Sequence, residues 1–158
     1  MTVIRYNSIG IIHSPFKENV GIPRQSVGAS DINGSIEVFD DYSTGLQDLD
    51  GFSHIVVIFH LHRVKRASLK AYPPWDDREH GVFATRSPYR PNPIGVSIVK
   101  LETIEQNIVH ISGIDMADGS PVLDIKPYVP DLNPSEGIKI GWLADKVEGM
   151  NKSKSGDR

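Results

Sequence analysis

Hydrophobic residues along the chain alternate with polar ones in short runs and do not follow helical spacing. Seven such runs, rich in Val and Ile, predict β-strands at residues 9–13, 35–39, 54–62, 82–85, 94–102, 108–114 and 122–127. The chain also has 14 Gly and 11 Pro, which interrupt it too often for long helices. One short helix is predicted at residues 44–49.

The order of these elements indicates the fold class. Residues 103–107 separate two predicted strands and indicate a hairpin, and Asp118-Gly119 indicates a tight turn before the last strand. Long helices do not alternate with the strands, which disfavours a doubly wound α/β sheet. We therefore predict a mainly β protein, a single-sheet closed or strongly curved β-barrel with short helices and long loops, the longest at residues 64–81.

Length and composition fit one such domain. A chain of 158 residues can bury a core without disulfides, and the absence of cysteine excludes thiol catalysis and Cys-ligated metal centres. We expect a barrel domain at residues 1–148 and a disordered tail at 149–158, which is polar apart from Met150. The sequence shows no signal peptide and no membrane-spanning run, so a cytoplasmic location is expected.

Charge is distributed unevenly along the chain. The net charge is −3, yet residues 60–100 carry eight Lys or Arg and three acids, a local charge of +5 that leaves −8 for the remainder. A basic segment inside an acidic chain indicates an anionic partner. A basic loop that is simply solvated is an equally common cause of this pattern.

Alternation along residues 54–62 places successive side chains on opposite faces of the strand. One face holds Ile55, Val57, Phe59 and Leu61. The other face holds His54, Val56, Ile58, His60 and His62, and the last two histidines have the spacing of metal ligands. A third ligand is missing, because His54 lies about 20 Å from His60 along an extended strand and the next carboxylate is Asp76. Polar residues at a barrel mouth are therefore favoured over a metal site.

The segment GVFATRSPYRPNPIG is the most unusual in the chain. Pro88, Pro91 and Pro93 each fix φ and restrict the residue before them, which stiffens the backbone. Arg86 and Arg90 are thus displayed with little conformational entropy to lose on binding. Their paired donors suit a carboxylate or a phosphate, and ion pairs with acids of the barrel are the structural alternative.

The segment GIDMADGSPVLDIKPY carries carboxylates on both sides of a turn. Asp115 and Asp118 precede the turn, whereas Asp124, Lys126 and Tyr128 alternate along the next strand and should share one face. An Asp and a Lys on one face can perturb each other's protonation, as acid–base chemistry requires. From the residues alone, a structural salt bridge is the favoured alternative.

Five strings of the sequence resemble one known family: IGIIHSPFKE, GIPRQ, DGFSHIVVIFHLHR, GVFATRSPYRPNPIGVSIVKLE and GIDMADGSPVLDIKPYVP. Over residues 9–130 they are similar to the TsaA-like proteins, the TrmO family of S-adenosylmethionine-dependent tRNA adenine N6-methyltransferases. The resemblance implies a small single-sheet barrel and a homodimer with the cofactor near the subunit boundary. It also implies methylation of N6 on threonylcarbamoyladenosine beside the anticodon of tRNA, without a metal.

The resemblance implies site residues as well. The cofactor, S-adenosylmethionine, would contact Pro23, Arg24, Gln25, His62, Arg63, Arg86, Val96, Asp115, Met116, Ala117 and Asp118. Because the lone pair of the acceptor nitrogen is delocalised, proton removal should accompany attack. The candidate bases are Asp124, Asp118 and Tyr128, and Lys126 could stabilise developing negative charge. The candidate RNA contacts are Lys65, Arg66 and Arg90.

Two other function classes remain open. In an RNA-binding barrel without catalysis, arginines of the proline-rich segment would contact phosphates while Tyr72, Trp75 and Tyr89 stack on bases. In a metal-dependent barrel enzyme, His60 and His62 would supply ligands. Calorimetry with S-adenosylmethionine and a metal analysis of the purified protein would separate these hypotheses.

Overall fold

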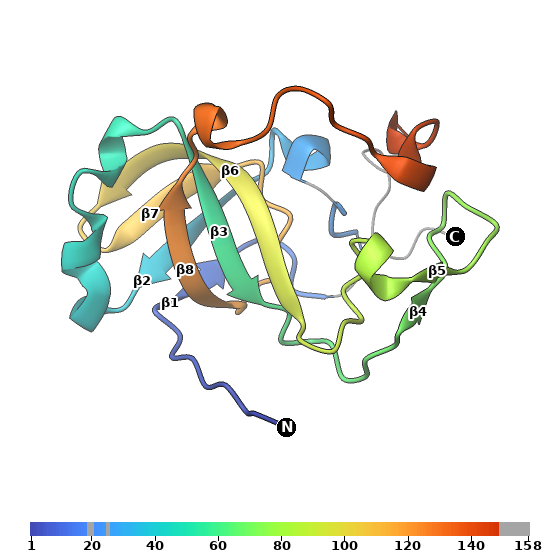
Figure 1. The fold of residues 1–158 in the computed structure, drawn as a ribbon. Helices are drawn as coiled ribbons and strands as arrows, with labels where there is room; N and C mark the ends of the chain where they lie inside the picture. Colours follow the sequence, from blue (N-terminus) through green and yellow to red (C-terminus); the bar gives the residue numbers. More distant parts are fainter. Residues whose placement is uncertain (19–20, 25, 149–158) are drawn as a thin grey trace.

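Six antiparallel strands close into a barrel in the computed structural model, which describes residues 1–18, 21–24 and 26–148 (Figure 1). The strands are β1 (Gly10–His13), β2 (Asn33–Val38), β3 (His54–His60), β6 (Ile94–Glu105), β7 (Ile108–Ser112) and β8 (Pro121–Pro127). Their order around the barrel is β1-β2-β7-β6-β3-β8, and β8 pairs with β1. The predicted mainly β barrel is confirmed. The predictions for Gln25 and for a disordered tail at 149–158 lie outside the described residues.

Smaller elements surround the barrel. β4 (Lys70–Ala71) and β5 (His80–Gly81) pair as a two-stranded sheet within the long segment predicted as a loop. The described chain also contains 3-10 helices: η1 (Ser26–Ala29), η2 (Asp40–Leu46), η3 (Leu49–Gly51), η4 (Val82–Ala84), η5 (Pro130–Leu132) and η6 (Gly141–Leu143). Within the described ranges, no helix has the length and apolar character needed to cross a membrane.

Six of the seven predicted strands are present, with ends shifted by a few residues. The prediction for residues 82–85 is wrong, because this stretch forms η4. Thr85 donates to Val82 O twice, from its N–H at 3.1 Å and from Oγ1 at 2.9 Å. Hydrogen bonds within the turn thus take the place of a strand ladder.

The helix predicted at residues 44–49 is also wrong. The chain forms η2 and η3 instead, and Asp48 separates them with a φ of +65°. A residue in the left-handed region cannot continue a right-handed helix. Two short 3-10 turns therefore replace the single helix.

Both predicted turns are present. β6 and β7 form the expected hairpin, although β6 continues to Glu105 and the turn narrows to Gln106 and Asn107. Gln106 has a φ of +56°, and Asn107 donates from Nδ2 to Val38 O at 2.8 Å. Gly119 has a φ of +78°, a conformation in which glycine avoids the strain of a side chain.

Side chains from every strand fill the barrel interior. On β3 the predicted alternation is confirmed, since Ile55, Val57 and Phe59 are buried. The other strands contribute Ile12, Ile36, Val38, Val99, Leu101, Val109, Ile111 and Val122. Branched aliphatic side chains of this kind fill a small barrel completely, so ligand sites are left to its ends and its outer surface.

The middle of the outward side of β3 and β6 is apolar, and we call it the outer face; the polar pair of His54 and Lys100 lies at one end of it. Antiparallel register places Val56 opposite Ile98 and Ile58 opposite Val96. Ile94, Val96 and Ile98 are 42%, 46% and 42% exposed. Large aliphatic side chains gathered on one exposed sheet surface are typical of interaction sites, whereas single exposed ones are not.

Gly95 on β6 lies directly against the Phe59 ring. A Cβ at this position would stand 2.4 Å from Phe59 Cζ. We predict that Gly95→Ala lowers the free energy of unfolding by about 1–3 kcal/mol, because the buried ring must move. Urea denaturation would measure the loss. Gly81→Ala is the control, since no atom lies within 4 Å of its Cβ position; equal losses in both variants would contradict the steric explanation.

Candidate functional site

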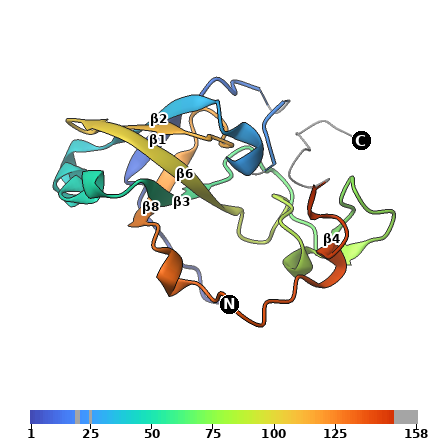
Figure 2. The ribbon, with the colours of Figure 1, turned by 90° about the horizontal axis from the view of Figure 1, so that it is seen from above.

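A cavity of about 1730 Å³ lies between one end of the barrel and residues 64–90, which we call the lobe. The lobe includes β4, β5 and η4 and stands beside the barrel (Figure 2). Phe59, Ser97 and Asp115 belong to the barrel wall of the cavity, and Tyr72 and Phe83 belong to the lobe wall. The volume exceeds the roughly 300–1,000 Å³ of ordinary ligand pockets.

Basic side chains dominate the charge of this cavity. They are Arg24, Arg63, Arg66, Lys70, Arg86 and Arg90. Asp115 is the one carboxylate among the described lining residues. Together with the aromatic walls, this charge favours a ligand that is anionic and has flat rings, such as a nucleotide.

Most residues predicted for the cofactor line this cavity, although they come from separate segments of the chain. The lining includes Pro23, Arg24, His62, Arg63, Arg86, Val96, Asp115 and Ala117. Met116 is completely buried, so its side chain packs in the core. Asp118 is not among the lining residues.

Asp115 is a strongly perturbed carboxylate in the cavity wall. Ser97 on β6 donates from Oγ to Asp115 Oδ1 at 2.5 Å. Burial raises the pKa of Asp115 from 3.8 to about 6, while the Ser97 hydrogen bond and the Arg86 charge oppose the shift. A ligand bearing a positive charge or hydroxyl donors would therefore be stabilised here and would favour the ionised carboxylate.

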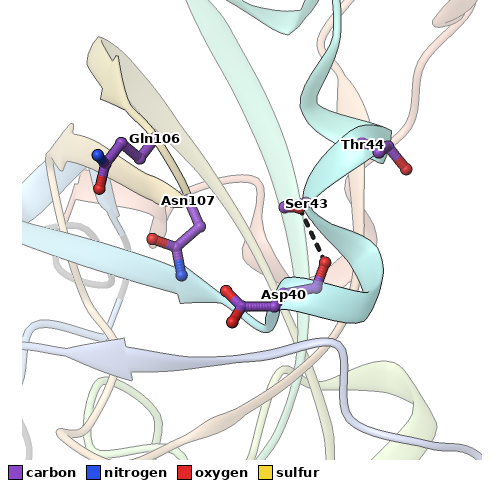
Figure 3. A pocket seen from close by; sticks show the side chains of 5 residues that line it. All are labelled: Asp40, Ser43, Thr44, Gln106 and Asn107. Atoms are coloured by element: carbon purple, nitrogen blue, oxygen red, sulfur yellow. Dashed lines mark hydrogen bonds between the residues drawn. The ribbon is translucent and has the colours of Figure 1, made fainter.

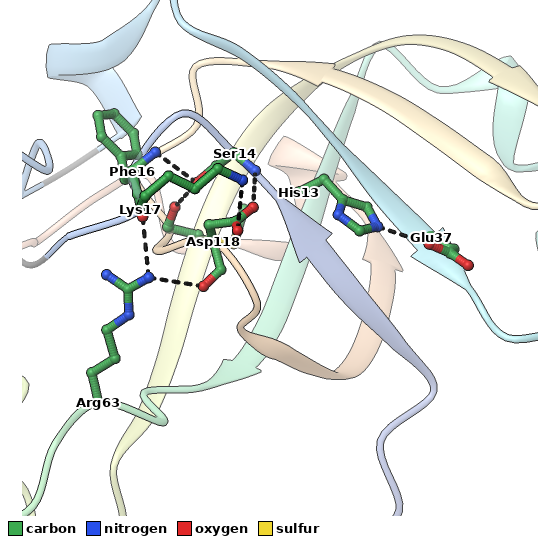
Figure 4. Close-up of polar contacts among 8 residues, drawn as sticks. His13, Ser14, Phe16, Lys17, Glu37, Arg63 and Asp118 are labelled. Carbon is green, nitrogen blue, oxygen red and sulfur yellow. Dashed lines mark hydrogen bonds and ion pairs between the residues drawn. The ribbon is translucent and has the colours of Figure 1, made fainter.

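Asp118 and Arg63 brace two loops against each other (Figure 4). Asp118 pairs with Lys17 at 2.7 Å and accepts the Ser14 N–H at 2.9 Å, and both contacts lower its pKa. Arg63 donates from Nη2 to Phe16 O at 3.2 Å and to Asp118 O at 3.0 Å. These contacts join the loop after β1 to the loop before β8, so Asp118 has a structural role that the sequence did not indicate.

His62, which follows β3, does not continue the alternation of the strand. β3 ends at His60, and the His62 N–H donates to His60 O at 2.8 Å, so the predicted strand extends two residues too far. His62 Nδ1 lies 3.2 Å from Ser120 Oγ, and burial, Arg63 and His60 lower the pKa of His62. In the described ranges, no group of three His, Cys, Asp or Glu side chains is placed to hold a metal ion.

Arg86 and Arg90 differ in their contacts. Arg90 is partly buried and donates from Nη1 to three main-chain oxygens, those of Val82 at 3.1 Å, Thr85 at 2.7 Å and Ser87 at 3.4 Å. Arg86 is exposed and donates from Nη2 to Val96 O at 3.2 Å. Arg90 thus holds the proline-rich loop together, and its contact with RNA stays a prediction. Arg86 is the better placed of the two for a ligand.

The predicted acid–base residues Asp124, Lys126 and Tyr128 do not line the cavity. Strand register places Asp124 and Lys126 opposite outward-facing residues of β3, so these two share the outer side of the barrel, as alternation predicts. Lys126 Nζ pairs with Asp124 Oδ2 at 2.7 Å, and the side chains are 60% and 44% exposed. Within one chain, this pair is therefore separate from the cavity.

A second, shallow hollow of about 420 Å³ lies at the far end of the barrel (Figure 3). Its lining consists of Asp40, Ser43, Thr44, Gln106 and Asn107. Ser43 donates from Oγ to Asp40 O at 2.8 Å, which stabilises the first turn of η2. Since none of the residues predicted for function lies there, the large cavity is the candidate site.

Sequence reasoning missed many residues of the cavity wall, among them Trp142, Leu143 and Ser97. Trp142 and Leu143 line it although they follow the last strand, and Ser97 lines it as the partner of Asp115. A Trp-Leu pair, apolar like Ile138 and Ile140 before it in the same segment, is a weak cue to the first two. A serine in a strand carries no cue to a partner in a distant loop.

Comparisons with known proteins match the chain to one family. Residues 11–133 match the model of the tRNA-methyltransferase O N-terminal domain. A probable S-adenosyl-L-methionine-binding protein of Pyrococcus abyssi is 49% identical over 99% of this chain and 85% of its own length. The mouse tRNA (adenine(37)-N6)-methyltransferase is 37% identical over 84% of this chain and 32% of its own length.

A crystal structure of TrmO from Pseudomonas aeruginosa matches with a TM-score of 0.74 and 36% identity. The match covers 89% of this chain and 63% of that chain. This chain thus spans less than two thirds of the solved TrmO chain and about a third of the mouse enzyme.

The raised pKa of Asp115 predicts a dependence of stability on pH. The folded protein holds a proton that the unfolded chain releases between pH 3.8 and about 6. The contribution of Asp115 to the free energy of unfolding is therefore greatest below this range and falls by about 3 kcal/mol as the pH rises to neutral. Asp115→Asn should lose less stability than the wild type over the same pH range in urea titrations.

Asp118→Asn is the matched control, because Asp118 lies in the same loop and its pKa is shifted in the opposite direction. The stability that Asp118 supplies is present at neutral pH and is lost as the pH falls through its lowered pKa. The two substitutions should therefore change the pH dependence in opposite directions. A change of the same sign in both variants would rule out burial as the cause at Asp115.

Proposed function

Because the chain belongs to the TrmO family, we propose that it is an S-adenosylmethionine-dependent methyltransferase acting on N6 of an adenosine beside the anticodon of tRNA. The observation that carries the proposal is the convergence of eight expected cofactor residues on one cavity. The proposed acceptor is threonylcarbamoyladenosine, and the proposed location is the cytoplasm, where its tRNA substrate would be found.

Two charged residues of the cavity, one from the lobe and one from the barrel wall, fit the proposed cofactor. Arg86 offers guanidinium N–H groups to the methionine carboxylate. Asp115 offers oxygens to the ammonium group or the ribose hydroxyls, contacts that favour its ionised form. When bound, S-adenosylmethionine supplies a methyl group on a sulfonium, which needs neither a metal nor a covalent enzyme intermediate for transfer. The residues of the cavity have the task of holding donor and acceptor in line.

The outer face supports a homodimer in which the two chains share each active site. Ile94 and Val96 belong both to the cavity lining and to the outer face, so the cavity opens beside an apolar surface. A second chain would bury that surface. It would also bring its own Asp124–Lys126 pair, which lies on the same side of the barrel, toward the cavity of the first chain.

Within such a dimer, Asp124 of one chain would accept the N6 proton at the cavity of the other. Lys126 would stabilise the negative charge that develops on the acceptor. Asp118 is a poorer base, because Lys17 and the Ser14 N–H lower its pKa and occupy its oxygens. Tyr128 remains the second candidate for the proton acceptor.

The proposal is tested with the purified chain, S-adenosylmethionine and tRNA with or without threonylcarbamoyladenosine. Nucleoside mass spectrometry should show one added methyl group on the modified adenosine. Binding of both ligands without transfer would instead support an RNA-binding barrel without catalysis. Activity that EDTA removes and a divalent ion restores would support the metal enzyme.

Arg86→Ala is predicted to weaken cofactor binding about ten- to a hundredfold, because a charge-assisted contact worth about 1.5–3 kcal/mol is lost. Arg86→Lys should recover part of this loss, since Lys keeps the charge but not the planar fork. Titration calorimetry measures both. Arg78→Ala removes an equal charge from an exposed position outside the cavity lining; an equal loss there would show that Arg86 acts through net charge alone.

Shared active sites predict complementation between subunits. A heterodimer of Arg86→Ala and Asp124→Asn chains, isolated with two affinity tags, contains one complete site and should keep about half of the wild-type activity. At a cofactor concentration near the wild-type dissociation constant, each homodimer should have little activity. Light scattering should give twice the mass of one chain.

The control places both substitutions in one chain paired with a wild-type chain. If sites are shared, each cavity of this dimer lacks either Arg86 or Asp124, and the dimer should have little activity at the same cofactor concentration. Half activity in this control would place each site within a single chain. A monomer in light scattering would reject the dimer altogether.

A further inference from the structure

After β8 the chain crosses from the barrel to the lobe as a strap of residues 130–148 (Figures 1 and 2). Residues 130–141 are all exposed, so this part of the strap packs little surface against the protein. The strap then reaches the cavity, where Trp142 and Leu143 form part of the wall. The position of that wall depends on how the end of the strap is anchored.

The anchor is a buried carboxylate in the lobe. The Asp76 side chain is 1% exposed, and it lies 2.9 Å from His80 Nε2 through Oδ2 and 2.7 Å from Lys146 Nζ through Oδ1. The His80 ring stacks on Trp142 with centroids 4.0 Å apart and an angle of 18°. Trp142 also donates from Nε1 to Ala84 O at 2.9 Å.

Asp76 therefore holds the strap through both of its oxygens. Lys146 is the direct link, and His80 transmits the contact to the ring of Trp142. Lys146 and His80 hold the pKa of Asp76 well below its usual range, so the anchor is charged at neutral pH. Removal of one partner of a buried ion pair leaves an uncompensated charge, which destabilises the arrangement strongly.

The cavity has two chemically different halves. The residues expected to contact the cofactor on the barrel side include His62, Val96, Asp115 and Ala117. The opposite half is aromatic and is formed by the lobe and the strap, with Tyr72, Trp75, Phe83, Tyr89 and Trp142. Aromatic side chains stack on nucleobases that have left the RNA helix, and such stacking is the usual way in which proteins bind an unpaired nucleotide.

We propose that Asp76 is a positioning residue which, through His80 and Lys146, holds Trp142 in the half of the cavity that takes the acceptor nucleotide. This inference rests on the proposed function and names the wall that recognises its RNA substrate. Release of the strap should weaken RNA binding and leave cofactor binding intact, because most expected cofactor contacts lie on the barrel side and Arg86, although part of the lobe, donates to Val96 O of β6.

The test measures the dissociation constant for tRNA at saturating cofactor, and separately the constant for the cofactor. Lys146→Met should weaken tRNA binding about tenfold, the loss expected for one stacked base. Lys146→Arg should restore it. Lys139→Met is the matched control, because it removes the same charge from an exposed position on the same strap.

Asp76→Asn separates positioning from electrostatic attraction. This variant makes the chain less negative, which by charge alone would strengthen binding to RNA. The proposal expects weaker binding, as in Lys146→Met. Stronger or unchanged tRNA binding in Asp76→Asn, if that variant folds, would overturn the proposal.

Fluorine NMR can follow the surroundings of Trp142, at the end of the strap, directly. With 5-fluorotryptophan the protein has two fluorine resonances, from Trp75 and Trp142, and Trp142→Phe assigns them. The Trp142 resonance should move in Lys146→Met and stay in place in Lys139→Met. A resonance that moves without a change in tRNA affinity would overturn the assignment to the acceptor, and so would an equal loss of cofactor affinity.

These binding and fluorine measurements do not depend on methyl transfer. A wild-type chain that transfers no methyl group would refute the proposed catalysis. The proposed positioning role of Asp76 would still be tested, because it requires that Lys146→Met and Asp76→Asn weaken tRNA binding and that Lys139→Met does not.

Discussion

The completely filled interior of the barrel is the constraint on which the rest of the structure depends. Ile12, Val57 and Val109 have no exposed surface, and similar side chains fill the space between the strands. A ligand must therefore bind at an end or on the outside. The closed sheet pairs its own main-chain groups, which leaves the connecting segments free to carry function. The lobe, the strap and the large cavity accordingly gather at one end.

At that end, hydrogen bonds from side chains, and not strand pairing, hold the loops in place. Arg90 donates to main-chain oxygens of the proline-rich loop, and Arg63 and Asp118 join three further loops, those after β1, after β3 and before β8. Charged residues that look suited to ligands in the sequence are thus used to hold the walls in place. Such preorganisation reduces the entropy lost on binding. Arg86 and Asp115 remain in the cavity with groups directed to a ligand's charges.

Alternation of side chains was sufficient to predict most of the barrel, because Ile55, Val57 and Phe59 show the two-residue period of a half-buried strand. It failed at residues 82–85, where contacts from Thr85 and Arg90 decide the backbone. Most of the predicted cofactor residues converge on the large cavity, because the motifs that carry them lie at the same end of the barrel. The role of Ser97 and the distance of Asp124 from the cavity follow from topology and have no local signal.

The pairing of β1 with β8, which closes the barrel, also determines when the chain can fold during its synthesis. Gly10 pairs with Val122, so the barrel cannot close until the last strand has left the ribosome. At bacterial or eukaryotic rates of synthesis this delay is on the order of ten seconds. During this delay, the main-chain groups at the free edges of β1 and β3 are unpaired, and strands of other chains can pair with them. Trp142 follows β8 in the chain and emerges later still, so a nascent chain surrounded by tRNA has no finished cavity until Trp142 has left the ribosome.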